Sequence, residues 1–222
     1  MKNYYLENAD NFGWGTQHQT ASYKINELLP FVTGNKILDV GCGPGSFVDV
    51  LASRGFDATG IDITPKFVSF ARKNYQGQFI VGDANKLPFD SNSFDTVFIR
   101  SVLEHVDNDQ KVLRESLRVG KKVVIIVPQL TPLSLQKRGL IFSHYQDQSH
   151  LRYYTVKSIE ELADSCKATL IDVQYTEPLP NKSIFYELLH GFSLFKRIAI
   201  KIIFTFFKPQ KYYLEIIAII KP

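Results

Sequence analysis

The chain has 222 residues, which is enough for one α/β domain with a substantial core and short for two. Hydrophobic residues make up 45% and charged residues 22%, and the two cysteines have no CxxC spacing, which argues against a disulfide framework or a zinc site. The net charge of +4 arises in residues 181–222, which carry 7 Lys and Arg against 2 Asp and Glu. Because no domain-wide basic surface is predicted, we expect no nucleic-acid partner.

The first half of the chain alternates between short apolar runs and amphipathic segments. Helices are predicted over residues 17–30, 46–54, 65–74 and 108–118, with Thr64 as the N-cap of the third. Strands are predicted over 37–40, 58–61, 78–81, 96–100 and 122–127. Continuous Val and Ile runs suit strands that are buried on both faces, and helical crossovers between such strands predict a doubly wound α/β fold.

The pattern changes beyond Pro128. Residues 129–154 are polar and aromatic without a clear period, and we interpret them as an insertion after the fifth strand. The capping-box spacing of Ser158 and Glu161 predicts a helix that opens at Ser158. A strand over 168–175, an apolar helical stretch over 183–207 and a last strand over 212–221 are expected to follow. No repeat or linker is visible, so residues 1–222 are predicted to form a single domain.

The location of the protein is predicted from its first residues. The N-terminal segment MKNYYLENADNFGWG has no apolar core of signal-peptide length, which favours a cytoplasmic location.

The segment KILDVGCGPGSF, residues 36–47, ends a predicted strand with three glycines in five residues. In open α/β sheets the first strand-to-helix turn is a ligand site, and glycines there let backbone amides approach the ligand. Nicotinamide and flavin enzymes use related loops, but the spacing here lacks the last glycine of GxGxxG. Asp39 precedes the glycines, where a carboxylate is unfavourable near a pyrophosphate and favourable beside a cation such as an α-ammonium group.

Two further carboxylates follow the next predicted strands. Asp62 ends the second strand, 21 residues after Gly41, where a carboxylate can accept hydrogen bonds from both ribose hydroxyls. Asp83 ends the third strand, where it can accept a hydrogen bond from an exocyclic amine such as adenine N6. Together with Asp39 they describe a ligand with an ammonium group, a ribose and an adenine but no phosphates. S-adenosylmethionine is such a ligand.

The chain resembles a known family at this point. The segments ILDVGCGPG, GID, GDANKLPF, SFDTVF and SVLEHV occur in the order and spacing of class I S-adenosylmethionine-dependent methyltransferases, and the small-molecule group that includes the quinone-biosynthesis enzymes is the most similar. The resemblance covers residues 30–128 and extends more loosely to Val173. It implies a Rossmann-like seven-stranded sheet with an antiparallel last strand, and an enzyme that transfers a methyl group.

The resemblance also implies roles for individual residues. It assigns the methionine end of the cofactor to Gly41, Cys42 and Gly43. The ribose is assigned to Asp62 with Ile63, the adenine to Asp83 with Ala84, and the loop beneath the sulfonium to Arg100 with Ser101.

The chain departs from some of these relatives at Ser101. In some quinone-biosynthesis relatives a glutamate stands at that position and joins a Glu-His pair to bind a divalent metal. Ser101 leaves Glu104 and His105 without an obvious third ligand, and two donors rarely hold a metal unaided. We therefore predict that the site holds no metal.

The candidate catalytic residues are histidines near the predicted carboxyl edge of the sheet. Displacement at a sulfonium needs no acid, and a base helps only when the nucleophile carries a proton. His105 follows the fourth strand and is a candidate base, although a structural role in that loop is equally compatible with the sequence. His144 lies in the 129–154 insertion, which is expected to fold over the site and contact the substrate, or else to remain an exposed loop.

The stretch 183–207 combines a wide apolar face with basic residues. Three interpretations remain open: a helix packed within the fold, a homodimer interface or lid over a lipophilic substrate, and peripheral contact with a membrane surface.

The function predicted from the sequence is methyl transfer to an oxygen or nitrogen nucleophile of a small, lipophilic molecule. The alternative is a non-catalytic protein that binds S-adenosylmethionine in a structural or regulatory role.

Overall fold

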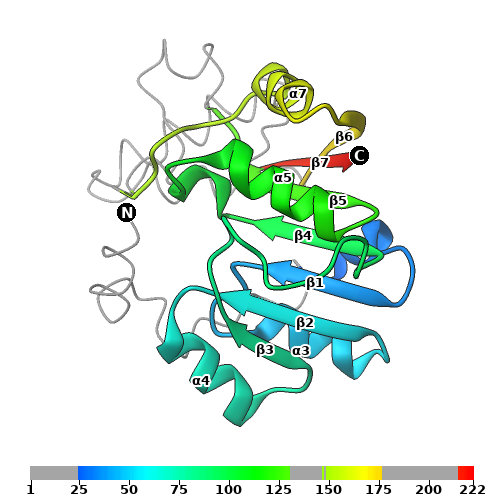
Figure 1. Cartoon of the computed structure of the whole chain (residues 1–222), viewed down its shortest axis with the longest axis vertical. Helices are drawn as coiled ribbons and strands as arrows, with labels where there is room; N and C mark the ends of the chain where they lie inside the picture. The colour runs from blue at the N-terminus through cyan, green and yellow to red at the C-terminus, as the bar shows by residue number, and fades with distance from the viewer. Residues whose placement is uncertain (1–24, 131–146, 148, 177–214) are drawn as a thin grey trace, which may run out of the picture.

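The structure is a computed structural model that describes residues 25–130, 147, 149–176 and 215–222 (Figure 1). Seven strands form one sheet in the order β3-β2-β1-β4-β5-β7-β6. Their bounds are Lys36–Val40 for β1, Asp57–Asp62 for β2, Gln78–Val81 for β3, Thr96–Arg100 for β4, Val123–Pro128 for β5, Thr169–Tyr175 for β6 and Glu215–Lys221 for β7.

Five strands of this sheet are parallel, and β7 pairs antiparallel with both β5 and β6. The carboxyl ends of β1, β2 and β4 therefore lie at one edge, on the left of Figure 1. The strand order reverses at β1, which has β2 on one side and β4 on the other. A crevice for a ligand is expected beyond the strand ends at such a point.

Helices cover both faces of the sheet and form two cores. One core joins the sheet to α3 (Ser46–Ser53) and α4 (Pro65–Asn74), and the other joins it to α5 (Asp109–Val119) and α7 (Val156–Ser165). Short 3-10 helices lie at Leu29–Phe31 (η1) and Leu103–His105 (η2). The strand β5, with the sequence VVIIVP, lies between the cores and is buried along its whole length.

The fold predicted from the sequence is confirmed: the sheet has seven strands, is mostly parallel and ends in an antiparallel strand. One local prediction is wrong, because the helix α7 does not open at Ser158. Thr155 is its N-cap, and the hydroxyl of Ser158 completes the capping box instead of Glu161. A serine hydroxyl at the N3 position can reach the N-cap amide as a glutamate does, so the chain holds two overlapping capping signals.

Several predicted segments lie outside the described residues. These are most of the 17–30 helix, the 183–207 stretch, His144 and much of the 129–154 insertion. The three interpretations of 183–207 and the single-domain assignment therefore stay predictions. Among the described residues, no helix is long and apolar enough to cross a membrane.

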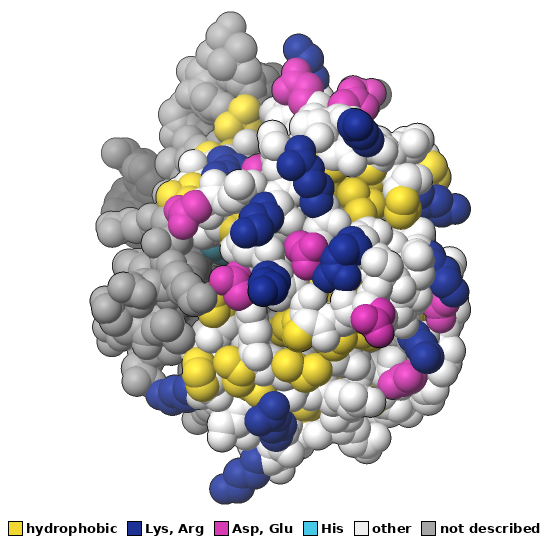
Figure 2. All heavy atoms as spheres, viewed as in Figure 1, with side chains coloured by type: hydrophobic (Ala, Val, Ile, Leu, Met, Phe, Trp, Pro, Cys, Tyr) yellow, Lys and Arg dark blue, Asp and Glu magenta, His cyan; other side chains and the backbone are white. Residues whose placement is uncertain are grey.

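The surface seen in Figure 2 carries both signs of charge. Lysine and arginine side chains alternate with aspartate and glutamate over the described part of this face, and apolar side chains lie between them. This distribution agrees with the near-neutral balance of the chain before residue 181.

Gly60 in β2 allows the glycine turn after β1 to pack closely on the sheet. A Cβ atom at this position would lie 2.7 Å from the Cys42 Sγ atom and 2.9 Å from a Val48 methyl group. We predict that Gly60→Ala lowers the free energy of unfolding by about 1–3 kcal/mol, because the added methyl group overpacks this contact. Urea denaturation measures the effect.

The matched control is Gly55→Asn, at a left-handed position whose missing Cβ faces open space. Asparagine tolerates this conformation, so a change below about 1 kcal/mol is expected. Equal stability of the Gly60→Ala variant and the wild type would show that the turn can move away from β2 without cost.

Candidate active site

A cavity of about 490 Å³ lies beyond the carboxyl ends of β1, β2, β3 and β4. Its walls come from the turns and loops that follow these strands and from η2. The lining residues are Gly41, Cys42, Gly43, Pro44, Ser46, Ile61, Asp62, Ile63, Thr64, Phe67, Gly82, Asp83, Ala84, Asn85, Arg100, Ser101, Val102, His105, Val106 and Asp107.

The glycine turn is fixed to β2 by its own backbone. The amides of Gly41 and Cys42 both donate to the carbonyl oxygen of Ile61, at 2.8 and 3.1 Å. Gly43 has a left-handed φ of 53°, and a Cβ atom there would meet no other atom within 4 Å. The backbone at Gly43 therefore faces open cavity, where a ligand can approach it without a side chain between them.

Asp62 fixes the same turn with its side chain. One carboxylate oxygen accepts from the Gly43 amide and the other from the Thr64 amide, each at 2.8 Å. Burial raises the pKa of Asp62, and these hydrogen bonds oppose the rise. Each oxygen has a second lone pair, so the carboxylate can also accept from two ligand hydroxyls.

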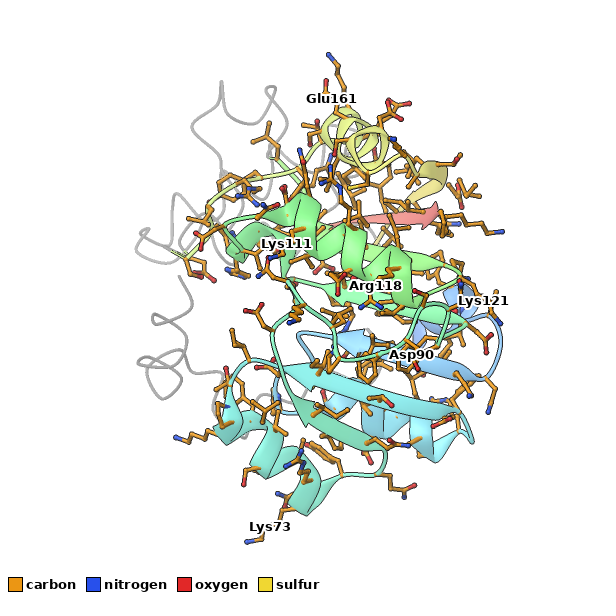
Figure 3. The ribbon with its side chains drawn as sticks, viewed as in Figure 1. Lys73, Asp90, Lys111, Arg118, Lys121 and Glu161 are labelled. Atoms are coloured by element: carbon orange, nitrogen blue, oxygen red, sulfur yellow. The ribbon has the colours of Figure 1, made fainter. Side chains whose placement is uncertain are left out.

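The loop after β3 places Asp83 on the cavity wall. The Asp83 Oδ1 atom accepts from the amide and the side chain of Asn85, both at 2.9 Å. Helix α5 anchors the following residues: Glu115 accepts from the Leu87 amide, and Arg118 donates to carbonyl oxygens at 87 and 89. Figure 3 shows Arg118 on α5 and Asp90 at the end of this loop.

Asp39 lies behind the cavity wall and does not line it. Its side chain is 1% exposed, and its Oδ2 atom is 3.7 Å from an Arg100 nitrogen. The Arg100 guanidinium also sits 4.5 Å from the ring centre of Phe47 and lines the cavity. Burial raises the pKa of Asp39 to about 6, while Arg100 lowers it and Asp62 adds to the rise. Asp39 therefore acts on the cavity mainly through Arg100.

The turn η2 carries Glu104 and His105. Both side chains are buried, and His105 lines the cavity. Burial raises the pKa of Glu104 to about 8, helped by the nearby carboxylates of Glu215 and Asp147. Burial also lowers the pKa of His105 to about 4. The contact of 4.0 Å between Glu104 Oε1 and His105 Nε2 is therefore not an ion pair near pH 7, because both groups are then predominantly neutral.

The described end of the 129–154 insertion, residues 149–154, lies against η2. The Leu151 amide donates to the carbonyl oxygen of Glu104 at 2.8 Å. The side chains of Arg152 and Tyr154 both donate to the carbonyl oxygen of Leu103, at 3.2 Å. The insertion thus supplies the hydrogen-bond donors that hold this short turn in place.

The structure brings a third potential metal ligand, His150, close to Glu104 and His105. Potential ligand atoms of Glu104, His105 and His150 all lie within 4.8 Å of one another. The premise that no third residue accompanies the Glu-His pair is therefore wrong. Metal binding itself stays untested.

The predicted site residues mostly come together. Nine of the ten residues of the predicted cofactor set line the cavity, and Asp39 is the exception. Of the two predicted catalytic residues, His105 lines the cavity and His144 lies outside the described residues. Sequence reasoning missed Asn85 and Ser149. It placed Asp147 and His150 in the insertion that was expected to contact the substrate, but not beside His105. Spacing gave no signal for the contacts of these insertion residues with His105, because they lie more than 40 residues beyond it and reach it only through tertiary structure.

A glycine turn, three acidic strand ends and a cavity at the point of strand reversal define a Rossmann-like domain for a nucleoside-containing cofactor. Comparison with known proteins refines this class. Residues 38–127 match the family model described as a methyltransferase domain.

Two curated relatives and one solved structure illustrate the similarity. The chain is 32% identical over 140 residues to a demethylmenaquinone methyltransferase of Thermotoga maritima, covering 61% of this chain and 60% of that protein. It is 31% identical to the 2-methyl-6-phytyl-1,4-hydroquinone methyltransferase of Synechocystis, covering 72% and 53%. The magnesium protoporphyrin IX methyltransferase of Synechocystis, solved with bound S-adenosylmethionine, superposes with a TM-score of 0.61 at 14% identity, covering 100% and 97%.

Residues 38–127 therefore match a methyltransferase domain, and the chain is similar to the quinone methyltransferases and to S-adenosylmethionine-dependent methyltransferases of this class. S-adenosylmethionine is the cofactor of this class. The chain spans less than two thirds of the length of the two curated relatives.

The role of Asp62 leads to a prediction about cofactor affinity. Asp62→Ala removes the predicted acceptor for two ribose hydroxyls and the acceptor of the Gly43 amide. We expect the free energy of S-adenosylmethionine binding to weaken by about 2–4 kcal/mol. Calorimetric titration measures the loss, and Asp57→Ala, at the exposed other end of β2, is the matched control. Unchanged affinity in the Asp62→Ala variant would refute the ribose assignment.

Asp39 leads to a prediction about the pH dependence of stability. Its pKa of about 6 in the folded protein lies above the ordinary value of 3.8, so the folded state binds more protons between these pH values. Stability is therefore lost as the pH rises from about 4 to about 6, by about 3 kcal/mol at most. We expect Asp39→Asn, which stays neutral, to lose correspondingly less stability between pH 4.5 and 7.5.

Urea denaturation at the two pH values measures the difference, with Asp57→Asn as the control. If the Asp39→Asn variant shows the same pH dependence as the wild type, then Asp39 is ionised in the folded protein throughout this range and the Arg100 contact outweighs its burial.

Proposed function

We propose that this protein is a methyltransferase that moves the methyl group of S-adenosylmethionine to an oxygen or nitrogen nucleophile of a small, lipophilic acceptor. The observation that carries the proposal is the joint lining of one cavity by two sets of residues. The glycine turn with Asp62 and Asp83 supplies contacts suited to the cofactor, and His105 with Val102 and Val106 forms another part of the wall. Cofactor and acceptor would then share one cavity.

Methyl transfer requires mainly that the protein aligns the acceptor with the cofactor and excludes water. The acceptor's nucleophile attacks the methyl carbon in line with the carbon–sulfur bond, and the bonding electrons leave on a neutral thioether sulfur. Because the leaving group needs no acid, proximity and a dry site supply most of the rate enhancement. Arg100, which lies beside the buried Asp39, and the backbone of Gly43 would position the methionine end of the cofactor.

The lipophilic character of the acceptor is supported by two independent points. The Synechocystis relative described above is named for a phytyl hydroquinone. The wall around His105 includes the apolar side chains of Val102 and Val106. Contact with a membrane or a second subunit through 183–207 stays a prediction from the sequence.

We also propose that the reaction needs no metal ion. This part of the proposal is supported by Ser101, which stands where some quinone-biosynthesis relatives have a metal-binding glutamate and which lines the cavity. The Nδ1 atom of His105 already contacts Ser149.

The experiment is a transfer assay with methyl-labelled S-adenosylmethionine and a panel of acceptors. The panel contains a long-chain 1,4-benzohydroquinone, a 1,4-naphthohydroquinone and a lipophilic aromatic amine. Labelled product is expected from at least one of them, and activity is expected to persist after treatment with EDTA.

The control is the Asp62→Ala variant, whose product formation should fall with its cofactor affinity. Cofactor binding without product from any acceptor class would favour the alternative of a non-catalytic protein that binds S-adenosylmethionine. Activity that disappears with EDTA and returns with a divalent metal would contradict the metal-free reaction alone.

A further inference from the structure

Arg100 supplies the positive charge of the cavity wall. It is the only lysine or arginine among the described residues that line the cavity, whose acidic residues are Asp62, Asp83 and Asp107. Arg100 is the last residue of β4, and its side chain is 18% exposed. The neighbouring strand is β1, after which the glycine turn follows. A ligand beside this turn therefore meets a permanent positive charge.

Two contacts hold the guanidinium of Arg100 without using its hydrogen-bond donors. Its Cζ atom lies 4.5 Å from the centre of the Phe47 ring. Its Nη2 atom lies 3.7 Å from Asp39 Oδ2, which is too long for a hydrogen bond. Nε is buried without a partner, and no hydrogen bond joins either Nη atom to another described residue. The guanidinium is thus held in place while its donors lack acceptors.

The Nη donors are the ones that a ligand can reach. Nε is the one guanidinium nitrogen that protein atoms enclose fully, so Nη1 and Nη2 keep the exposure of this group. A guanidinium presents its N–H groups in a rigid planar fork that matches the two oxygens of a carboxylate. Because polar groups of this kind normally have partners, an arginine without acceptors in a cavity wall indicates that a ligand supplies them.

The methionine end of the cofactor carries such a carboxylate. The glycine turn is assigned to this end, and the loop after β4 lies against the turn: a Cβ atom at Gly41 would be 2.3 Å from a Val102 methyl group. The same end also carries an α-ammonium group. Arg100 attracts the carboxylate and repels the ammonium, whereas Asp39 does not line the cavity. The charge presented to the amino-acid end is therefore that of the arginine.

We propose that Arg100 binds the α-carboxylate of the cofactor through its Nη atoms. This contact, and not one between Asp39 and the α-ammonium group, makes the site selective for nucleosides that carry the complete amino-acid end. The inference rests on the cofactor of the proposed function and deepens it, because it names the group by which that cofactor is recognised. Binding, and not methyl transfer, is what it predicts.

The test is calorimetric titration of the wild-type full chain with three ligands. S-adenosylhomocysteine is compared with an analogue that lacks only the α-carboxylate and with one that lacks only the α-ammonium group. All three have a neutral sulfur, so the sulfonium charge does not enter the comparison. The analogue without the carboxylate is expected to bind roughly 10- to 100-fold more weakly than S-adenosylhomocysteine. The analogue without the ammonium group is expected to lose less.

The variant Arg100→Met removes the charge and the N–H donors and keeps an unbranched apolar side chain. Its affinity for S-adenosylhomocysteine should fall by the same factor, while the analogue without the carboxylate should bind at least as tightly as it binds the wild type. The preference for the carboxylate is then lost. The matched control is Arg114→Met on the exposed side of α5, where the arginine donates to the carbonyl oxygen of Ser165. It should leave all three affinities unchanged.

Two variants at Asp39 complete the comparison. Removal of Arg100 alone leaves Asp39 buried without a cation beside it, so the double variant Asp39→Asn with Arg100→Met removes both charges and should also lose the preference. Asp39→Asn alone should keep it, because Arg100 remains. Thermal unfolding checks that each variant is folded, and the comparison of ligands on the wild type needs no variant.

Equal affinity of the wild type for S-adenosylhomocysteine and for the analogue without the carboxylate would overturn the inference. A preference that survives in Arg100→Met would also overturn it, since another group would then bind the carboxylate. A larger loss for the analogue without the ammonium group would overturn it in favour of a contact with Asp39. The expected preference without methylation of any acceptor would leave the carboxylate contact intact and remove the proposed function.

Discussion

The site depends on one carboxylate with two acceptor oxygens. Asp62 stands at the end of β2 and accepts from the amides of Gly43 and Thr64. The first bond fixes the glycine turn after β1, and the second fixes the start of α4. Two crossovers of the doubly wound fold are therefore tied together at the point where the cofactor lies in this class of protein. Asp62 can also accept hydrogen bonds from ribose hydroxyls only because its two hydrogen bonds from backbone amides leave lone pairs unused.

Several carboxyl groups in or beside the cavity are buried. Asp39, Asp62 and Glu104 all have pKa values raised by burial, so the folded protein holds three carboxyl groups under unfavourable conditions within or beside one cavity. Groups of this kind are more common at functional sites than elsewhere, because the cost is accepted only where the charge is used. Arg100 offsets part of that cost for Asp39 and at the same time forms part of the cavity wall.

The parallel strands and their helices could be predicted from the sequence because the patterns that indicate them are local. Continuous Val and Ile runs predicted β4 and β5 within one or two residues, and Thr64 with Pro65 predicted the start of α4. The cofactor loops could be predicted for a related reason. In a parallel sheet the carboxyl ends of all strands lie at the same edge, so the sequence alone predicts that Asp62 and Asp83 lie close together.

The remainder required tertiary structure. No local pattern shows that Ser149 reaches His105 or that Arg152 holds η2, because those contacts cross the insertion after β5. The ammonium contact expected of Asp39 was inferred from charge alone, whereas the structure shows an arginine of β4 between that carboxylate and the cavity. Spacing gives the strand end on which a residue lies, but not the neighbour that meets its side chain.

The account depends most on the identity of the cofactor. Calorimetric titration of the full chain with S-adenosylhomocysteine, S-adenosylmethionine and NAD tests it directly. Saturable binding of one equivalent of each sulfur nucleoside is predicted, with no binding of NAD, because the glycine turn lacks the last glycine of the GxGxxG pattern. Binding of NAD, or failure of both sulfur nucleosides to bind, would contradict the account.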